Sequence, residues 1–568
     1  MTLAQPNAEA LFQQGMNHWR NHDRVQAAER YQAAADAGHA EAMAHLGRMF
    51  FRGEGIPKQP DLALIWLQRS AAHKNARGLY HLAELYQDGV AVERSQETYT
   101  KFLEQAAQAG SPDALAELGQ CHWYGHGVPR DREKAEAIFR KAATLPREQF
   151  YPGTLAWLYR DGHGFAKDPE IAFKEAFRAN TEGYGTAGIH LANYYIQGVG
   201  TDKNPSKALE LLTAPSNLTN PRALMQLARM IEKGEGLSEN PVQAFQLYRK
   251  SAQTGEPVAM LILGVFYQRG LGTDKNPEEG FKWLLKSAEA GFPVAIGWVG
   301  QCYLHGRGIA QNTSYALRWI RKGADLNEPG SLYNFGWCYQ EGIGVEKDPK
   351  EALKFYTRSA DMDFSAAVHQ VGWCYESGTG VEKNIQTAIQ RYQQAAQAGW
   401  SWSESRMGWI YLNGIGVTSD YTEALRWYRI AEGHGNPNAM AQIGWMHENG
   451  LGIPRDLGLA LDQYYKAGGK DYAWAWFRAG SILLQPGHPF SNAEKARRSF
   501  GEGAAIKDKA CMRELGRCLL LGLGGPVDRD LAIDWLQKAA NAGDAQAGDL
   551  LKLTQLKHDP EAGPEESD

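Results

Sequence analysis

Phe335-Gly336-Trp337-Cys338-Tyr339 is the stretch that decides the fold, because variants of it follow at a fixed spacing. The copies are Val371-Gly372-Trp373-Cys374-Tyr375, Met407-Gly408-Trp409-Ile410-Tyr411 and Ile443-Gly444-Trp445-Met446-His447. Their tryptophans lie 36 residues apart without slippage. A fixed period of this length is typical of proteins in which each repeat is one supersecondary unit packed on its neighbours. The sequence therefore predicts a solenoid and not a set of separate globular domains.

Each repeat is predicted to be an antiparallel helical hairpin. Leu332, Phe335 and Tyr339 follow the i, i+3, i+7 spacing of one helix face, and Gly342 is a plausible left-handed cap at its end. After the loop, Asp348 precedes a proline, which is a common helix start. Paired Gly-x-Gly loops recur at most repeats and mark about fifteen such hairpins. The predicted fold is all-α, an α/α superhelical solenoid.

The two ends of the chain depart from the repeat pattern. Residues 1–39 lack the Gly-x-Gly loop and are interpreted as an atypical N-terminal capping hairpin. Residues 40–543 form the repeat array, and 544–557 are predicted to be a C-terminal capping helix. The acidic, proline-containing stretch 558–568 is predicted to be a disordered tail.

Composition limits the classes of partner. Sixty basic against 65 acidic residues give a net charge of -5, which does not suggest a nucleic-acid partner. The first residues lack the basic and apolar regions of a signal peptide, and no window is apolar enough for a membrane span. Five of the six cysteines share one phase of the repeat and are expected to be buried thiols. We therefore expect a cytoplasmic protein.

The repeat also resembles a known family. Residues 113–143 follow its pattern through Leu118-Gly119, Gly125-His126-Gly127-Val128, Asp131, Lys134-Ala135 and Lys141-Ala142-Ala143. This pattern resembles the Sel1-like repeat family of bacterial and other proteins, which is related to the tetratricopeptide repeat, and the resemblance runs from about residue 40 to 545. It implies an α/α solenoid that binds other proteins as an adaptor or scaffold.

No pattern in the sequence indicates catalysis. The Gly-x-Gly loops are not followed by Lys-Ser or Lys-Thr, so they are interpreted as turns and not as phosphate loops. Histidines near these loops occur singly, without a second ligand at zinc spacing. We expect no enzymatic activity, no cofactor and no metal.

The tryptophans of the four quoted repeats are predicted to lie away from the apolar face of their helix, at a position called here their phase. At about 100° per residue, Trp337 lies roughly 140° from the apolar stripe of its helix. Other repeats carry Arg48, Glu84 or Gln120 at this phase. A core position should not accept such residues, so we expect this phase to be exposed in the concave groove. The alternative is that each tryptophan packs between neighbouring first helices.

These tryptophans and the residues on the same helix face are the predicted binding residues. They are Trp337, Trp373, Trp409, Trp445, Tyr333, Trp402, His369, Gln340, Glu376 and Glu448. The expected function is a protein–protein interaction scaffold or adaptor that binds a partner protein or peptide in the groove. The alternative is a stoichiometric inhibitor or immunity-type protein that occludes a single enzyme or effector.

Overall fold

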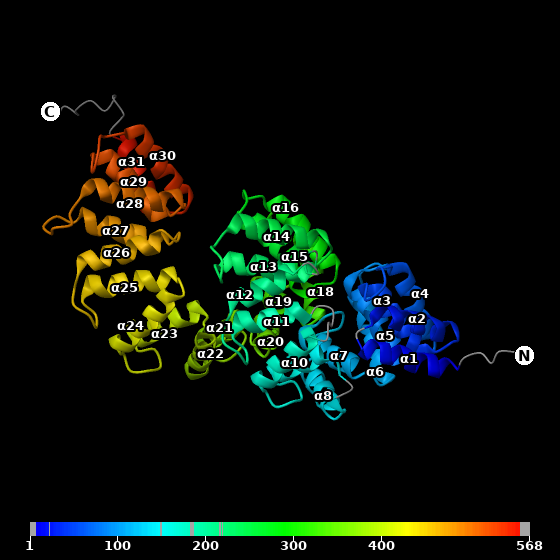
Figure 1. Cartoon of the computed structure of the whole chain (residues 1–568). Helices are drawn as coiled ribbons and strands as arrows, with labels where there is room; N and C mark the ends of the chain where they lie inside the picture. The colour runs from blue at the N-terminus through cyan, green and yellow to red at the C-terminus, as the bar shows by residue number, and fades with distance from the viewer. Residues whose placement is uncertain are drawn as a thin grey trace, which may run out of the picture. The chain divides into compact units, whose positions relative to one another are not determined.

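The computed structural model describes residues 7–21, 23–147, 150–181, 187–214, 217–218 and 220–556. Over these residues the protein is all-helical, with 31 helices and no strand (Figure 1). The helices pair in order, α1 with α2 through α29 with α30, and α31 follows. The prediction of an all-α solenoid of about fifteen hairpins is confirmed. The predicted disordered tail, residues 558–568, lies outside the described residues.

Most helices of the array have about the same length, as expected for repeats of one hairpin. The first helices of the hairpins are α1 (Ala8–Arg20), α3 (Ala40–Arg52), α5 (Ala76–Asp88), α7 (Pro112–Tyr124), α9 (Pro152–Asp161), α11 (Ala187–Gln197), α13 (Pro221–Lys233), α15 (Pro257–Arg269), α17 (Pro293–His305), α19 (Pro329–Glu341), α21 (Ser365–Ser377), α23 (Ser401–Asn413), α25 (Pro437–Asn449), α27 (Ala473–Leu484) and α29 (Lys509–Leu521). The second helices are α2 (Arg24–Asp36), α4 (Pro60–Ala72), α6 (Gln96–Gln108), α8 (Arg132–Ala143), α10 (Pro169–Thr181), α12 (Pro205–Thr213), α14 (Pro241–Gln253), α16 (Pro277–Glu289), α18 (Thr313–Asp325), α20 (Pro349–Ala360), α22 (Ile385–Gln397), α24 (Tyr421–Gly433), α26 (Leu457–Gly468), α28 (Ala493–Ala505) and α30 (Arg529–Asn541), and the last helix is α31 (Ala545–Leu556).

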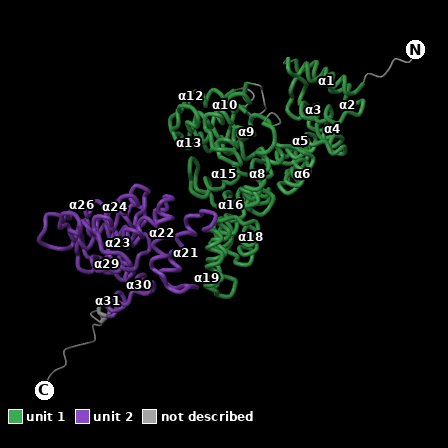
Figure 2. Tube along the Cα trace, turned by 90° about the horizontal axis from the view of Figure 1, so that it is seen from below, with its two compact units in different colours: residues 1–359 green, residues 360–568 purple. Residues whose placement is uncertain are grey.

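The chain divides into two compact units, residues 1–359 and residues 360–568 (Figure 2). Each unit is a stack of hairpins. In both units, consecutive first helices touch one another, as α3 does with α5 and α23 with α25. Contacts between consecutive second helices are fewer. In a curved stack the inner layer is the more crowded one, so the first helices line the inner side of each unit.

Local chemistry explains how one hairpin is built. A Cβ atom on Gly336 would lie 2.9 Å from the ring of Tyr356, so glycine permits the two helices to approach closely. Gly342 ends the first helix in the left-handed conformation, with φ of 74°, and its N–H donates to the carbonyl of Cys338. Asp348 then caps the second helix by accepting hydrogen bonds of 2.9 and 3.1 Å from two backbone N–H groups.

Loops from distant repeats meet within unit 1. Arg94, in the loop between α5 and α6, donates a 2.9 Å hydrogen bond to the carbonyl of Gly255, which lies 161 residues later. Asn327 donates a 2.9 Å bond to the carbonyl of Arg130, 197 residues earlier. The Arg130 N–H in turn donates to the carbonyl of Leu326 at 2.9 Å. Successive turns of the unit 1 superhelix therefore touch each other.

All six cysteines are buried and free, as predicted for the five that share a phase. Burial raises the pKa of the Cys121 thiol to about 12 and that of Cys338 to about 11. These thiols are protonated at neutral pH, and they act as small packing residues.

Candidate functional site

A pocket of about 390 Å³ opens on the inner side of unit 2. Its walls come from α21, α22, α23 and α25. The lining residues are His369, Trp373, Tyr392, Trp402, Ser405, Arg406, Trp409, Asn438 and Gln442. Four of them, His369, Trp373, Trp402 and Trp409, are among the binding residues that the sequence predicts.

The tryptophans give the pocket flat apolar walls. Trp402 and Trp409 are seven residues apart on α23 and therefore share one face of the helix. Trp402 is 48% exposed and Trp373, on α21, is 36% exposed. Trp409 is half-buried and packs against the hydrophobic clusters of two consecutive repeats. The sequence leaves open whether the repeated tryptophans are exposed or packed between helices. In this pocket Trp373 is exposed and Trp409 is packed, so both arrangements occur.

Arg406 is held rigidly at the wall of the pocket. Its guanidinium lies 3.8 Å from the ring centroid of Trp409 and forms a two-nitrogen ion pair with Glu376. The hydroxyl of Tyr392 also donates to Glu376, at 2.7 Å. Glu376 does not line the pocket itself. Its hydrogen bonds with Arg406 and Tyr392 hold these two lining residues in place.

The remaining polar groups of the pocket can donate or accept hydrogen bonds. Ser405 donates to the amide oxygen of Asn438 at 2.9 Å, and the Asn438 amide donates to the hydroxyl of Tyr472 at 2.8 Å. The ring of His369 lies 2.8 Å from the hydroxyl of Ser403. Burial, aided by the charge of Arg406, lowers the pKa of His369 to about 4, so its ring is neutral at pH 7. The arrangement is suited to binding a group that is partly apolar and partly polar.

Two further predicted residues of unit 2 lie outside this pocket. Trp445 is half-buried and packs against two hydrophobic clusters. Glu448 accepts a 2.7 Å hydrogen bond from the hydroxyl of Tyr464 and forms an ion pair with Arg478. This arrangement repeats the one around Glu376, so the two glutamates have the same structural role.

The other three predicted residues belong to unit 1. Trp337 is half-buried, with its ring centroid 5.9 Å from that of His305. The ring of Tyr333 lies 5.5 Å from that of Tyr356, whose hydroxyl donates to the side-chain oxygen of Gln340 at 3.1 Å. The tryptophan column is therefore divided between the two units, with Trp337 in the first and the other three in the second.

One premise of the sequence interpretation is wrong. An arginine at position 48 favours an exposed helix face, yet Arg48 is only 5% exposed. Its guanidinium forms a 2.8 Å ion pair with Glu54, and the side chain of Glu84 at the same phase is 13% exposed. In this part of unit 1 the inner face is enclosed, so charged residues are buried there in pairs.

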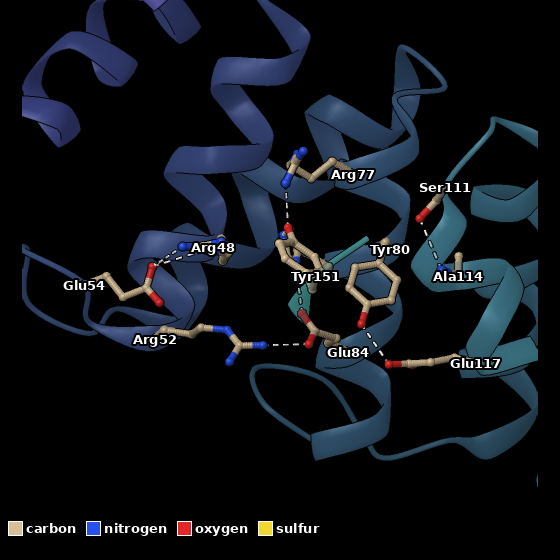
Figure 3. A network of polar contacts seen from close by, with 12 residues as sticks. Arg48, Arg52, Glu54, Arg77, Tyr80, Glu84, Ser111, Ala114, Glu117 and Tyr151 are labelled. Carbon is tan, nitrogen blue, oxygen red and sulfur yellow. Dashed lines mark hydrogen bonds and ion pairs between the residues drawn. The ribbon is translucent and has the colours of Figure 1, made fainter. Parts of the chain in front are cut away.

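Sequence reasoning missed the polar network that these residues form (Figure 3). Arg52 forms a 2.6 Å ion pair with Glu84, which also contacts the ring of His81 at 2.6 Å. Tyr80 donates to Glu117 at 2.8 Å. The available signal was the clustering of arginine and glutamate at first-helix positions of neighbouring repeats.

Neither a metal centre nor a membrane span is found in the described part of the chain. No group of three or more His, Cys, Asp or Glu side chains is placed there to hold a metal ion. None of its helices has the length and apolar character needed to cross a bilayer.

The family model of the Sel1 repeat matches thirteen segments of the chain. They are residues 40–75, 76–111, 112–146, 155–174, 189–214, 221–255, 257–292, 293–328, 329–364, 365–400, 403–436, 437–469 and 509–544, which together make up well over half of it. No curated protein matches the sequence.

Several solved structures are similar to the chain. One is a protective antigen of uropathogenic Escherichia coli, described as displaying an SLR fold, with 22% identity, a TM-score of 0.40, and 95% of this chain and 99% of that one covered. A Sel1 repeat protein from Oxalobacter formigenes is 32% identical, with a TM-score of 0.38 and coverage of 43% of this chain and 99% of its own. An immunity protein from Pseudomonas aeruginosa is 18% identical, with a TM-score of 0.31 and coverage of 39% and 82%.

Sel1 repeat proteins generally mediate protein–protein interactions, and they are typically not catalysts. The thirteen matched repeats and the all-helical stack of hairpins both support membership of this family. The chain belongs to the Sel1 repeat family.

Proposed function

We propose that this protein is an interaction scaffold and that the aromatic pocket of unit 2 binds a segment of a partner protein. The observation that supports this most is the grouping of Trp373, Trp402 and Trp409 around one recess, with two of them more than a third exposed. Tryptophan and arginine are enriched among the residues that dominate binding energy at protein interfaces.

The pocket is organised before any partner binds. Arg406 is fixed by Glu376 and by the ring of Trp409, so little side-chain freedom remains to be lost on binding. Asn438 and Gln442 add amide groups from α25. We infer that the pocket accepts an apolar or aromatic side chain of the partner, while the amides bond to the adjacent backbone.

The test is affinity capture from the source cells, followed by titration of the purified partner. The double variant Trp373→Ala/Trp402→Ala removes the two exposed rings and should weaken binding about 30-fold or more, the effect of losing a hot spot worth about 2 kcal/mol. Its circular dichroism should match that of the wild type, because neither ring is fully buried.

Phe490→Ala is the matched control. Phe490 is also an exposed aromatic residue of unit 2, at 42%, and it does not line the pocket. This variant should retain the partner. Equal affinity of the wild type and the double tryptophan variant would disprove the proposed site.

The same titration distinguishes the inhibitor alternative. A stoichiometric inhibitor or immunity-type protein would capture one enzyme in a fixed ratio and abolish its activity. A scaffold would capture a partner without inhibiting it, or would capture several.

A further inference from the structure

A second site lies in unit 1, where the contacts between superhelical turns enclose the inner face. Two adjoining chambers of about 410 and 240 Å³ occur there, and both are lined by Gln87, His126, His190 and Arg222. Arg94 anchors the wall by its hydrogen bond to the Gly255 carbonyl. The larger chamber has the size that is typical of small-molecule sites in proteins.

Every carboxylate that lines these chambers already has a partner. Glu54 pairs with Arg48, and Glu84 pairs with Arg52. Glu117 accepts hydrogen bonds of 2.8 and 2.5 Å from the hydroxyls of Tyr80 and Tyr99 (Figure 3 shows the first). Glu256 of the smaller chamber lies 3.7 Å from Arg94. The acidic side of the lining is therefore satisfied within the protein.

Arg222 differs from the other lining arginines. Its guanidinium forms no hydrogen bond or ion pair with any residue that the structure describes. Burial lowers the pKa of Arg222, but the more distant carboxylates of Asp88 and Glu256 outweigh burial, so its pKa is raised and the group stays charged. A guanidinium has five N–H donors, and enclosing it without partners is unfavourable.

The groups beside Arg222 in both chambers are neutral. Burial is the main cause that lowers the pKa of His126 and of His190 to about 4, so both rings are uncharged at pH 7. Gln87 is a neutral amide. The part of the lining shared by the two chambers therefore carries one positive charge, from Arg222.

The smaller chamber has apolar walls. Ile189, Met225, Val258 and Phe292 line it, together with the amides of Asn193 and Gln226. Its apolar surface can hold a hydrocarbon group, and Arg222 stands where the two chambers meet.

We propose that the cavity of unit 1 binds a small organic anion. Its carboxylate or phosphate group pairs with Arg222, since a guanidinium matches the geometry of either group with two parallel hydrogen bonds. Its apolar part lies in the smaller chamber. This site is in a different unit from the proposed protein-binding pocket and is independent of it.

Calorimetric titration of the full-length protein with four six-carbon probes tests which head-group charge the cavity prefers on a hydrocarbon of constant length. The probes are hexanoate, hexyl phosphate, hexanol and hexylamine. At least one of the two anions should bind ten times or more tightly than hexanol and hexylamine. The affinities of hexanoate and hexyl phosphate, compared with each other, show whether the site prefers a carboxylate or a phosphate. If inorganic phosphate binds as tightly as hexyl phosphate, the apolar chamber does not hold the hydrocarbon part of the ligand, and that part of the proposal is overturned.

Two variants locate the site. Arg222→Gln should weaken the favoured anion at least tenfold and abolish its advantage over hexanol, whereas Arg249→Gln, at an exposed arginine on α14, should change nothing. Met225→Trp fills the smaller chamber without removing the charge, and it should weaken the six-carbon anion.

The proposal is overturned if neither anion binds more tightly than hexylamine, or if Arg222→Gln keeps the wild-type affinity. Should Arg222→Gln fail to fold, the ranking of the four probes on the wild type and the effect of Met225→Trp decide the question.

Discussion

Tyr392 and Tyr464 each donate a hydrogen bond to a glutamate sixteen residues earlier, Glu376 and Glu448. Tyr428 occupies the same place in the intervening repeat, but the residue sixteen positions before it is Leu412. The hydroxyl of Tyr428 is buried and has no hydrogen-bond partner among the described residues. A buried polar group without a partner is destabilising.

The pair Tyr428→Phe and Tyr392→Phe tests this difference. Tyr428→Phe removes only an unpaired hydroxyl, so the free energy of unfolding should be unchanged or up to about 1 kcal/mol higher. Tyr392→Phe removes a hydrogen bond to a carboxylate and should cost about 1 to 2 kcal/mol. Urea denaturation followed by circular dichroism measures both. A larger loss for Tyr428→Phe than for Tyr392→Phe would contradict the assignment.

Glu117 gives unit 1 a dependence on pH. Burial raises the pKa of its carboxyl from 4.5 to about 7, although hydrogen bonds from Tyr99 and Tyr80 oppose that shift. Between these two values the unfolded chain has lost the proton while the folded protein keeps it. The contribution of Glu117 to the free energy of unfolding is therefore fully present below pH 4.5. It falls by up to about 3 kcal/mol as the pH rises towards 7.

Glu117→Gln should remove this dependence. The variant should unfold at a higher temperature than the wild type at pH 8, because the folded wild type must then bury a charge. At pH 4.5 the two should differ much less. Thermal scans at the two pH values measure the effect, and a variant that is less stable than the wild type at pH 8 would show that the carboxylate is stabilising.

Within a hairpin, two glycines of the same repeat should respond in opposite ways to alanine. Gly414 ends α23 with φ of 66°, and a Cβ atom there would lie 3.3 Å from the backbone nitrogen of Ser419. Gly414→Ala should therefore cost about 1 to 2 kcal/mol. Gly433 is at the end of α24 and has no atom within 4 Å of an added Cβ, so Gly433→Ala should be neutral or stabilising by up to about 1 kcal/mol. Denaturation midpoints of the two variants check the sign.

These hairpin features were predictable from the sequence because they are local. The helix face of Leu332 and Tyr339, the left-handed Gly342 and the cap at Asp348 depend on residues within a few positions of each other. The fold and its number of hairpins follow from repeating that local pattern, so they too could be read from the sequence.

The candidate sites were less predictable because they depend on contacts between distant repeats. Trp402 and Trp409 share a helix face, which the periodicity indicates, but the recess they form with Trp373 depends on how two repeats pack. Arg48 is buried between the ring of Trp19 in the preceding hairpin and the carboxylate of Glu54. The repeat pattern does not indicate that these side chains meet, because the contact with Trp19 depends on how two hairpins pack.

Arg94 is one of the side chains that join distant repeats of unit 1. Arg94→Ala removes the hydrogen bond to the Gly255 carbonyl and the nearby charge for Glu256. Amides of residues 88–96 and 253–258 should then exchange hydrogen faster, because the two loops are no longer joined. Exchange in the helices of unit 2 should stay the same, as should exchange throughout the Arg249→Ala control. Unchanged exchange in both loops would show that the contact does not hold the turns together.

Photocrosslinking from inside the aromatic pocket is the most direct test that unit 2 binds a partner. Benzoylphenylalanine placed at Trp402 is close in size to the native ring, and irradiation of the source cells joins it only to atoms within contact distance. We predict one or a few discrete crosslinked proteins from position 402 and none of these from the exposed position Phe490. The absence of any crosslinked protein at 402, or the same set from both positions, would contradict the proposed function of the pocket.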